Sequence, residues 1–153
     1  ELARPSRFCP AMLEIATNQP LVAALQRRDD DLLGVLTDHP RSIALYGALG
    51  PAAVLGAVLP IWRGNGLARN DWDGDDQNFA LRPLISGVAF SLIGPSPSSA
   101  DVDPLGVLGN AVTAILGPER ASQEQLRAAA SEIVDFLREA QAAALRLIDF
   151  PEA

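Results

Sequence analysis

The chain has 153 residues and a formal net charge of −7, and all 12 of its basic residues are arginine, so it contains no lysine. With one cysteine, one histidine and one tyrosine in addition, this composition excludes a lysine Schiff base, a P-loop lysine, a cysteine redox pair and a zinc site built from several histidines. Nucleic acid is also a poor partner for an acidic chain, because phosphate binding needs clustered positive charge.

Length and hydrophobicity indicate one folded domain over residues 1–153. Apolar residues make up 48% of the chain, and a chain of this size buries enough surface to fold without disulfides or a bound cofactor. The lone cysteine, Cys9, cannot form an internal disulfide, and the first ten residues do not resemble a signal peptide. We therefore expect a cytoplasmic protein without a cofactor.

Prolines divide the first part of the chain into short apolar stretches. A helix tolerates proline in its first turn, where the missing N–H has no acceptor, and Asn18 and Asp38 precede two of these prolines as plausible N-caps. This punctuation predicts short helices at 10–17, 20–28, 30–37, 40–49 and 51–59.

Two glycine-, asparagine- or serine-rich stretches, residues 60–82 and 94–103, lack the periodicity of a helix and predict long loops. The apolar segment Pro83–Leu92 lies between them and is expected to be a buried helix, because no second convincing strand is available to pair with it. Another helix is predicted at 104–116, after Asp103 and Pro104.

The last predicted element is a long amphipathic helix at about 122–148. Ser122 and Gln125 have the spacing of a capping box, and apolar residues follow at alternating steps of four and three. The sequence thus predicts an all-α bundle of about seven to eight helices. The stripe on the last helix is a candidate interaction surface, formed by Leu126, Ile133, Leu137 and Leu147.

The stretch 60–82 contains the other candidate sites. Trp62 and Trp72 would either close over a ligand or partner, or pin the loop to the core, and the sequence favours neither. Asp71, Asp73 and Asp75 alternate beside a glycine, as in a calcium-binding loop, but they do not fit the EF-hand register. A solvated acidic loop is the favoured interpretation, with calcium as the alternative.

No nucleophile and base are paired convincingly. Asp38 is better explained as a helix cap than as an orienting group for His39, and Cys9 as a small apolar residue. We therefore do not expect an enzyme.

These observations favour a non-enzymatic protein–protein interaction or regulatory domain that uses the stripe, the Trp/Asp-rich loop or both, with a protein partner or a second copy. The first alternative is a bundle that binds an apolar small molecule between its uncharged helices. The second is a helical hairpin over Ile43–Trp62 that inserts into membranes. That run has no charge over 20 residues, but glycines and prolines interrupt it, so a membrane partner is disfavoured.

Overall fold

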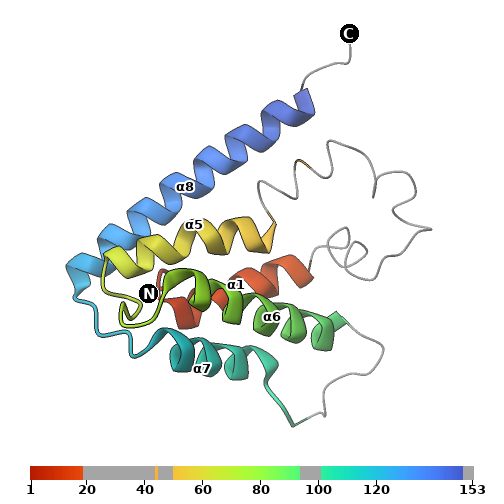
Figure 1. Cartoon of the computed structure of the whole chain (residues 1–153). Helices are drawn as coiled ribbons and strands as arrows, with labels where there is room; N and C mark the ends of the chain where they lie inside the picture. Colours follow the sequence, from red (N-terminus) through yellow and green to blue (C-terminus); the bar gives the residue numbers. More distant parts are fainter. Residues whose placement is uncertain (19–43, 45–49, 94–100, 150–153) are drawn as a thin grey trace.

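The computed structural model of the chain describes residues 1–18, 44, 50–93 and 101–149. These residues form helices and no strand, which confirms the all-α class. The helices are α1 (Pro5–Thr17), α5 (Pro51–Gly64), α6 (Gly74–Ile93), α7 (Pro104–Leu116) and α8 (Gln123–Asp149) (Figure 1). The expected seven to eight helices exceed the five found in these ranges. The helices predicted at 20–28 and 30–37, and nearly all of 40–49, lie outside the described residues.

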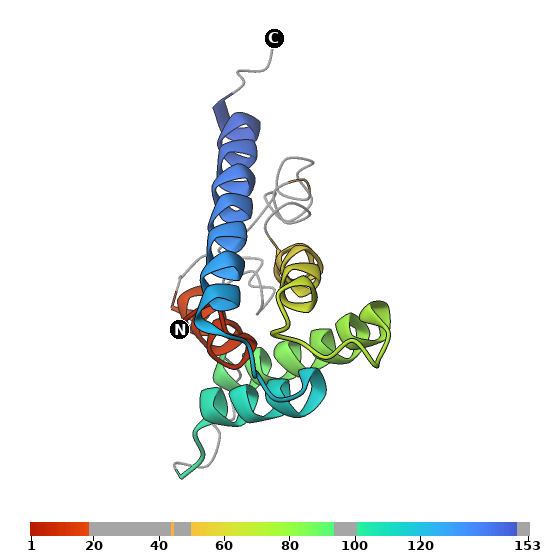
Figure 2. The same ribbon diagram turned by 90° about the vertical axis from the view of Figure 1, so that its left-hand side faces the viewer.

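The helices are arranged around α5. α7 packs against α1 and α6, α1 also contacts α6, and α5 contacts α6 and α8. Figure 2 shows α8 standing away from the layer formed by α6 and α7, with α5 between them. At 27 residues, α8 is about 40 Å long, and its C-terminal part diverges from α5 in both views.

Several predicted boundaries are wrong because proline and glycine were interpreted as breaks. α1 begins at Pro5 instead of residue 10, and α5 continues through Pro60 to Gly64. α6 already begins at Gly74 and contains Pro83. The predicted loop at 60–82 therefore shrinks to residues 65–73.

The interior prolines are tolerated because of where they lie. Pro60 and Pro83 are exposed, so the carbonyl that each of them leaves without an intrahelical donor can turn towards water. The carbonyl freed by half-buried Pro10 is that of Ser6, which faces Gly109 of α7. The opposite faces carry buried residues such as Leu59, which hold the helices together across the break.

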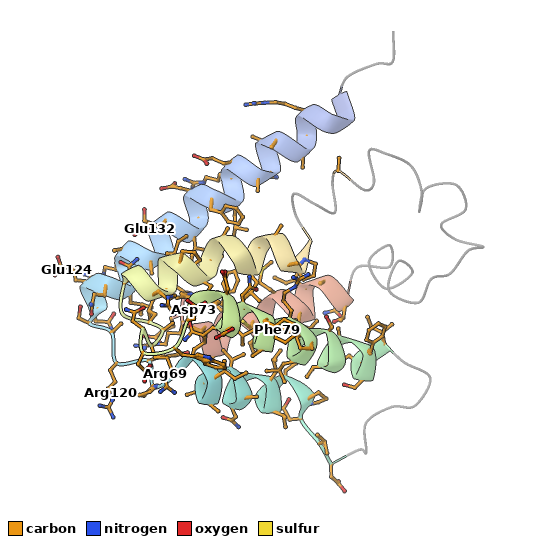
Figure 3. The ribbon with its side chains drawn as sticks, viewed as in Figure 1. Arg69, Asp73, Phe79, Arg120, Glu124 and Glu132 are labelled. Carbon is orange, nitrogen blue, oxygen red and sulfur yellow. The ribbon has the colours of Figure 1, made fainter. Side chains whose placement is uncertain are left out.

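The later helices begin where the sequence predicts. The Asp103 carboxylate accepts a hydrogen bond from the Gly106 amide at 3.0 Å, as an N-cap of α7. Ahead of α8, the Gln125 amide donates to Ser122 Oγ at 3.2 Å and the Ser122 amide donates to Gln125 Oε1 at 2.8 Å, which confirms the capping box. Glu124 and Glu132 are exposed along α8 (Figure 3). Of the loop predicted at 94–103, only residues 101–103 are described, and they are not helical.

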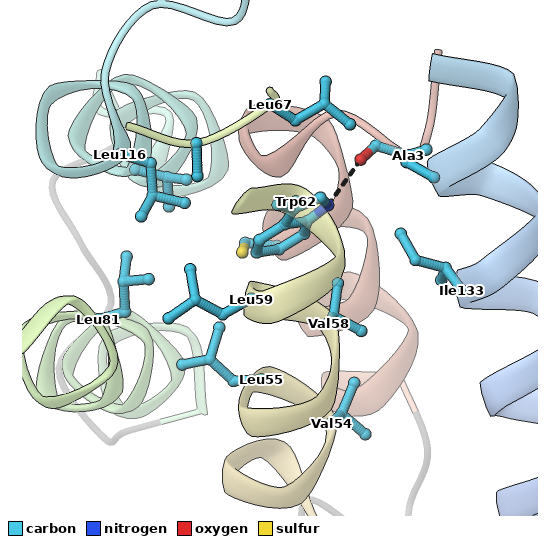
Figure 4. Packing of buried hydrophobic residues seen from close by; sticks show 14 of the residues in the cluster. Ala3, Val54, Leu55, Val58, Leu59, Trp62, Leu67, Leu81, Leu116 and Ile133 are labelled. Carbon is cyan, nitrogen blue, oxygen red and sulfur yellow. Dashed lines mark hydrogen bonds between the residues drawn. The ribbon is translucent and has the colours of Figure 1, made fainter. Parts of the chain in front are cut away.

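The core is centred on Trp62, which is fully buried on α5 (Figure 4). Its indole Nε1 donates a hydrogen bond to the Ala3 carbonyl at 2.8 Å. Phe8 meets the indole edge to face, with ring centroids 5.5 Å apart. Because Trp62 contacts the N-terminal segment as well as its own helix, one side chain joins α5 to the start of the chain.

Candidate functional site

The loop between α5 and α6, residues 65–73, is held in place by Arg63. Its Nη1 donates to the carbonyls of Arg69 and Trp72, at 3.2 and 2.8 Å, and to Gln77 Oε1 at 2.6 Å. Gln77 is fully buried and returns a hydrogen bond from Nε2 to the Arg69 carbonyl at 3.0 Å. The guanidinium and the amide thus fix the middle and the C-terminal end of the loop.

Backbone contacts join the same loop to α5 and α7. The amides of Leu67 and Ala68 both donate to the Trp62 carbonyl, and Gly66 has a φ of 71° that permits the turn. The Arg69 amide donates to the Leu116 carbonyl at the end of α7, at 2.7 Å. The loop is therefore part of the packed body of the protein.

The aspartates of this loop have separate structural roles. Asp71 pairs with Arg69 through two contacts of 2.6 Å, and the hydrogen bond from Arg69 lowers the pKa of Asp71. Asp73 Oδ1 accepts from the Asp75 amide at 2.8 Å and so caps α6, while the Asp75 side chain is exposed. Within the described residues no group of three or more His, Cys, Asp or Glu is placed to hold a metal ion. The arrangement favours the acidic-loop interpretation over calcium.

The two tryptophans do not form a pair on a loop. Trp62 belongs to α5 and is fully buried, which corrects its expected place in the loop, whereas Trp72 lies in the loop and is half-buried. The expected loop position of Trp62 is wrong because the helix was predicted to end before Pro60, whereas α5 continues to Gly64. Of the two roles considered, the structure gives Trp62 the one of anchoring the chain to the core.

The apolar stripe of α8 faces the body of the protein. Leu126 and Ile133 are each 4% exposed and belong to the core, and Leu137 is partly buried against it. Beside the stripe, Asn65 Nδ2 in the loop after α5 donates a hydrogen bond to Glu132 Oε1 on α8 at 3.1 Å. The side chain of Leu147 lies outside the described residues. At Leu126 and Ile133 the stripe is thus occupied by the chain's own core.

One pocket of about 290 Å³ lies between α5 and α6. Arg63, Asp75 and Asn78 contribute polar groups to its wall, and neither tryptophan lines it. Asn78 Oδ1 is buried without a hydrogen-bond partner among the described residues. Gly56, Leu59 and Pro60 of α5 form the apolar part of the wall.

The remaining predicted groups are a buried thiol and a pair outside the structure's described ranges. Burial raises the pKa of the Cys9 thiol to about 12, with the charge of Glu119 adding to the effect. Asp38 and His39 lie outside the described residues.

None of the helices in the described ranges combines the length and apolar composition that a membrane crossing requires.

Sequence reasoning missed the outer face of α6. Phe79 (Figure 3) is 79% exposed and Phe90 is 61% exposed, although Leu81 and Ala89 of the same helix are buried in the core. The signal available in the sequence was their spacing of 11 residues, which places two side chains on one face of a helix. That signal depends on α6 starting at Gly74, whereas the sequence predicts a loop that continues to residue 82.

Comparisons with protein-family models, curated proteins and solved structures found no match to this chain.

Proposed function

We propose that the chain is a non-enzymatic helical interaction domain, and that its contact surface for a protein partner is the outer face of α6. The observation that carries the proposal is the exposure of Phe79 and Phe90 on that face. Exposed aromatic side chains supply most of the energy at many protein interfaces, because they bury a large area with little loss of rotamer entropy. This surface replaces the stripe of α8, whose Leu126 and Ile133 are used in the core.

The roles of the polar groups agree with a binding domain. The Cys9 thiol stays protonated at neutral pH, since its pKa is raised to about 12. Asp73 caps a helix, and Asp71 pairs with Arg69. Each of these groups is engaged in holding the fold. A cytoplasmic location is part of the proposal, because a fold with one buried thiol does not depend on an oxidising compartment.

A photo-crosslinking amino acid at position 79 or 90 tests the proposal. In cells that naturally produce the protein, p-benzoylphenylalanine at either position is expected to give discrete covalent adducts heavier than the chain itself. The matched control is the same group in place of Val134, an exposed apolar residue on α8, where no such adduct is expected. Adducts at neither position 79 nor position 90 would overturn the proposal.

A further inference from the structure

Residues 64–66 have the sequence Gly-Asn-Gly, and position 65 is the only place in the chain where a glycine follows an asparagine. An asparagine before a glycine can react with its own backbone, because the glycine has no Cβ to hinder the approach of its amide nitrogen to the side-chain carbonyl carbon. The other four asparagines of the chain are followed by residues with a side chain. The sequence therefore singles out Asn65 for this chemistry.

The reaction is an intramolecular acyl transfer followed by hydrolysis. The backbone nitrogen of Gly66 gives its proton to solvent and forms a bond to Asn65 Cγ. The bond from Cγ to Nδ2 breaks, and Nδ2 takes a proton from solvent and leaves as ammonia. Water then opens the cyclic imide: cleavage between Gly66 N and Cγ gives aspartate, and cleavage between Gly66 N and the backbone carbonyl carbon of residue 65 gives isoaspartate. Both products carry a carboxylate where the asparagine was neutral.

The fold holds Asn65 away from this reaction. The residue ends α5 with a ψ of 10°, an angle at which the Gly66 nitrogen is turned away from the Asn65 side chain. Asn65 Nδ2 donates hydrogen bonds to the Ile61 carbonyl at 2.9 Å and to Glu132 Oε1 on α8 at 3.1 Å. The Gly66 amide donates to the Arg63 carbonyl at 3.3 Å. Ring closure therefore requires that these hydrogen bonds break and that the backbone rotates at Asn65.

The protecting contacts lie at the surface, where they can open. Asn65 is half-buried, and both Gly66 and Glu132 are exposed (Figure 3). Hydrogen bonds of exposed loops break more often than those of the core. The only reactant that the chain does not supply is water, which reaches this position from the surface.

We propose that Asn65–Gly66 is a site of spontaneous deamidation, that docking of the loop on α8 slows the reaction, and that the product weakens this docking. The new carboxylate at position 65 would face Glu132 Oε1 and the Ile61 carbonyl oxygen, which both accept hydrogen bonds from Asn65 Nδ2. Oxygens without a proton between them repel each other, so two attractive contacts become unfavourable. The inference does not depend on the proposed contact surface of α6.

The effect reaches the packing between α5 and α8. Glu132 precedes Ile133, which belongs to the core. An isoaspartate also adds a backbone carbon to the turn in which the Leu67 and Ala68 amides donate to the Trp62 carbonyl. The modified chain therefore holds the loop less firmly, and the loss of ammonia makes the change irreversible.

The first experiment follows the purified full chain at neutral pH and physiological temperature. Because the chain has no lysine, trypsin cuts only after arginine and releases residues 64–69 as one peptide. Chromatography and mass spectrometry separate the asparagine form of this peptide from its two products. Both products should accumulate over weeks in the folded chain, and at least tenfold faster in concentrated urea, where the protecting hydrogen bonds are lost. A portion digested at the start corrects for reaction during digestion.

The second experiment uses matched variants at position 132. Glu132→Ala removes one acceptor of Asn65 Nδ2 and should speed the reaction in the folded chain roughly threefold. Glu132→Gln keeps an Oε1 that can accept the same hydrogen bond, so its rate should stay close to that of the wild type.

The third experiment measures the effect of the product on stability. Asn65→Asp carries the same side chain as the aspartate product and should unfold at a lower urea concentration than the wild type. The same substitution in the Glu132→Gln chain should lower the urea midpoint less, because the like charge at position 132 is absent.

Each part of the inference can be overturned. Deamidation at position 65 is refuted if the folded wild type forms no product, and protection by the fold is refuted if the folded and urea-treated chains react at equal rates. Equal rates for Glu132→Ala and Glu132→Gln would exclude protection by α8. An unchanged urea midpoint in Asn65→Asp would exclude the effect of the product on docking.

Discussion

Cys9 lies on the inner side of α1, where burial raises the pKa of its thiol to about 12 from an ordinary value of 9.0. The nearby charge of Glu119 acts in the same direction. The folded chain therefore keeps the thiol proton in a pH range where the unfolded chain releases it. Since the thiolate is the reactive form of cysteine, burial also makes this group inert towards electrophiles in the folded state.

We predict that Cys9 makes the protein less stable at alkaline pH. Between pH 9 and pH 12 the unfolded state binds fewer protons than the folded state, so the free energy of unfolding falls as pH rises, and its full value is present below pH 9. Urea unfolding of the wild type and of Cys9→Ala across this range measures the effect. The wild type should lose stability more steeply, and parallel curves for the two proteins would contradict the prediction.

Residue roles were predictable from the sequence where they depend on neighbours in the chain. Ser122 and Gln125 form the expected capping box, because both partners lie within four residues. The hydrogen bonds of Arg63 to Gln77 and to the loop carbonyls could not be foreseen, since they depend on how α5 and α6 pack. The same holds for Trp62, whose acceptor is the carbonyl of Ala3, 59 positions away in the sequence.

At the level of elements, the close approach of α1 and α7 depends on Gly109. A Cβ at this position would lie 2.8 Å from the backbone carbonyl oxygen of Ser6. Backbone cannot move aside as a flexible side chain can, so any larger residue must push the two helices apart. Glycine in the middle of a helix is otherwise unfavourable, and its presence here is explained by packing.

We predict that Gly109→Ala destabilises the protein by about 1–3 kcal/mol, because overpacking outweighs the gain in helix propensity. The matched control is Gly56→Ala on α5, where the nearest atom to an added Cβ is Asn78 Nδ2 at 3.9 Å. That variant should gain roughly 0.5–1 kcal/mol from helix propensity alone. Thermal and urea unfolding measure both. A gain in stability at Gly109 would show that α1 and α7 pack less tightly than described.

The helix limits show where sequence patterns stop being informative. α7 and the start of α8 were predicted correctly because their caps are local signals. α5 and α6 were cut short because Pro60 and Pro83 are ordinarily helix breakers. Both prolines are exposed, and the residues that continue each helix are held by burial of Trp62 on α5 and of Leu81 on α6. Tertiary packing therefore overrides the local preference at these two positions.

For the whole molecule, the main question is which apolar surface remains available after folding. The stripe of α8 packs towards the body at Leu126, Ile133 and Leu137, whereas Phe79 and Phe90 of α6 point to the outside. An interaction through the stripe would require α8 to leave α5, which exposes part of the core. An interaction through α6 requires no rearrangement.

We therefore predict that Leu137→Asp lowers stability without changing association. A carboxylate at this partly buried position faces the core, so the free energy of unfolding should fall by about 1–3 kcal/mol. Val134→Asp, on the exposed side of the same helix, should change it by less than about 0.5 kcal/mol. Urea unfolding measures stability, and adduct formation from p-benzoylphenylalanine at position 79 or 90 measures association. If Leu137→Asp abolished these adducts while the chain stayed folded, the contact surface would include the stripe of α8 after all, and α8 would have to detach from α5 to form it.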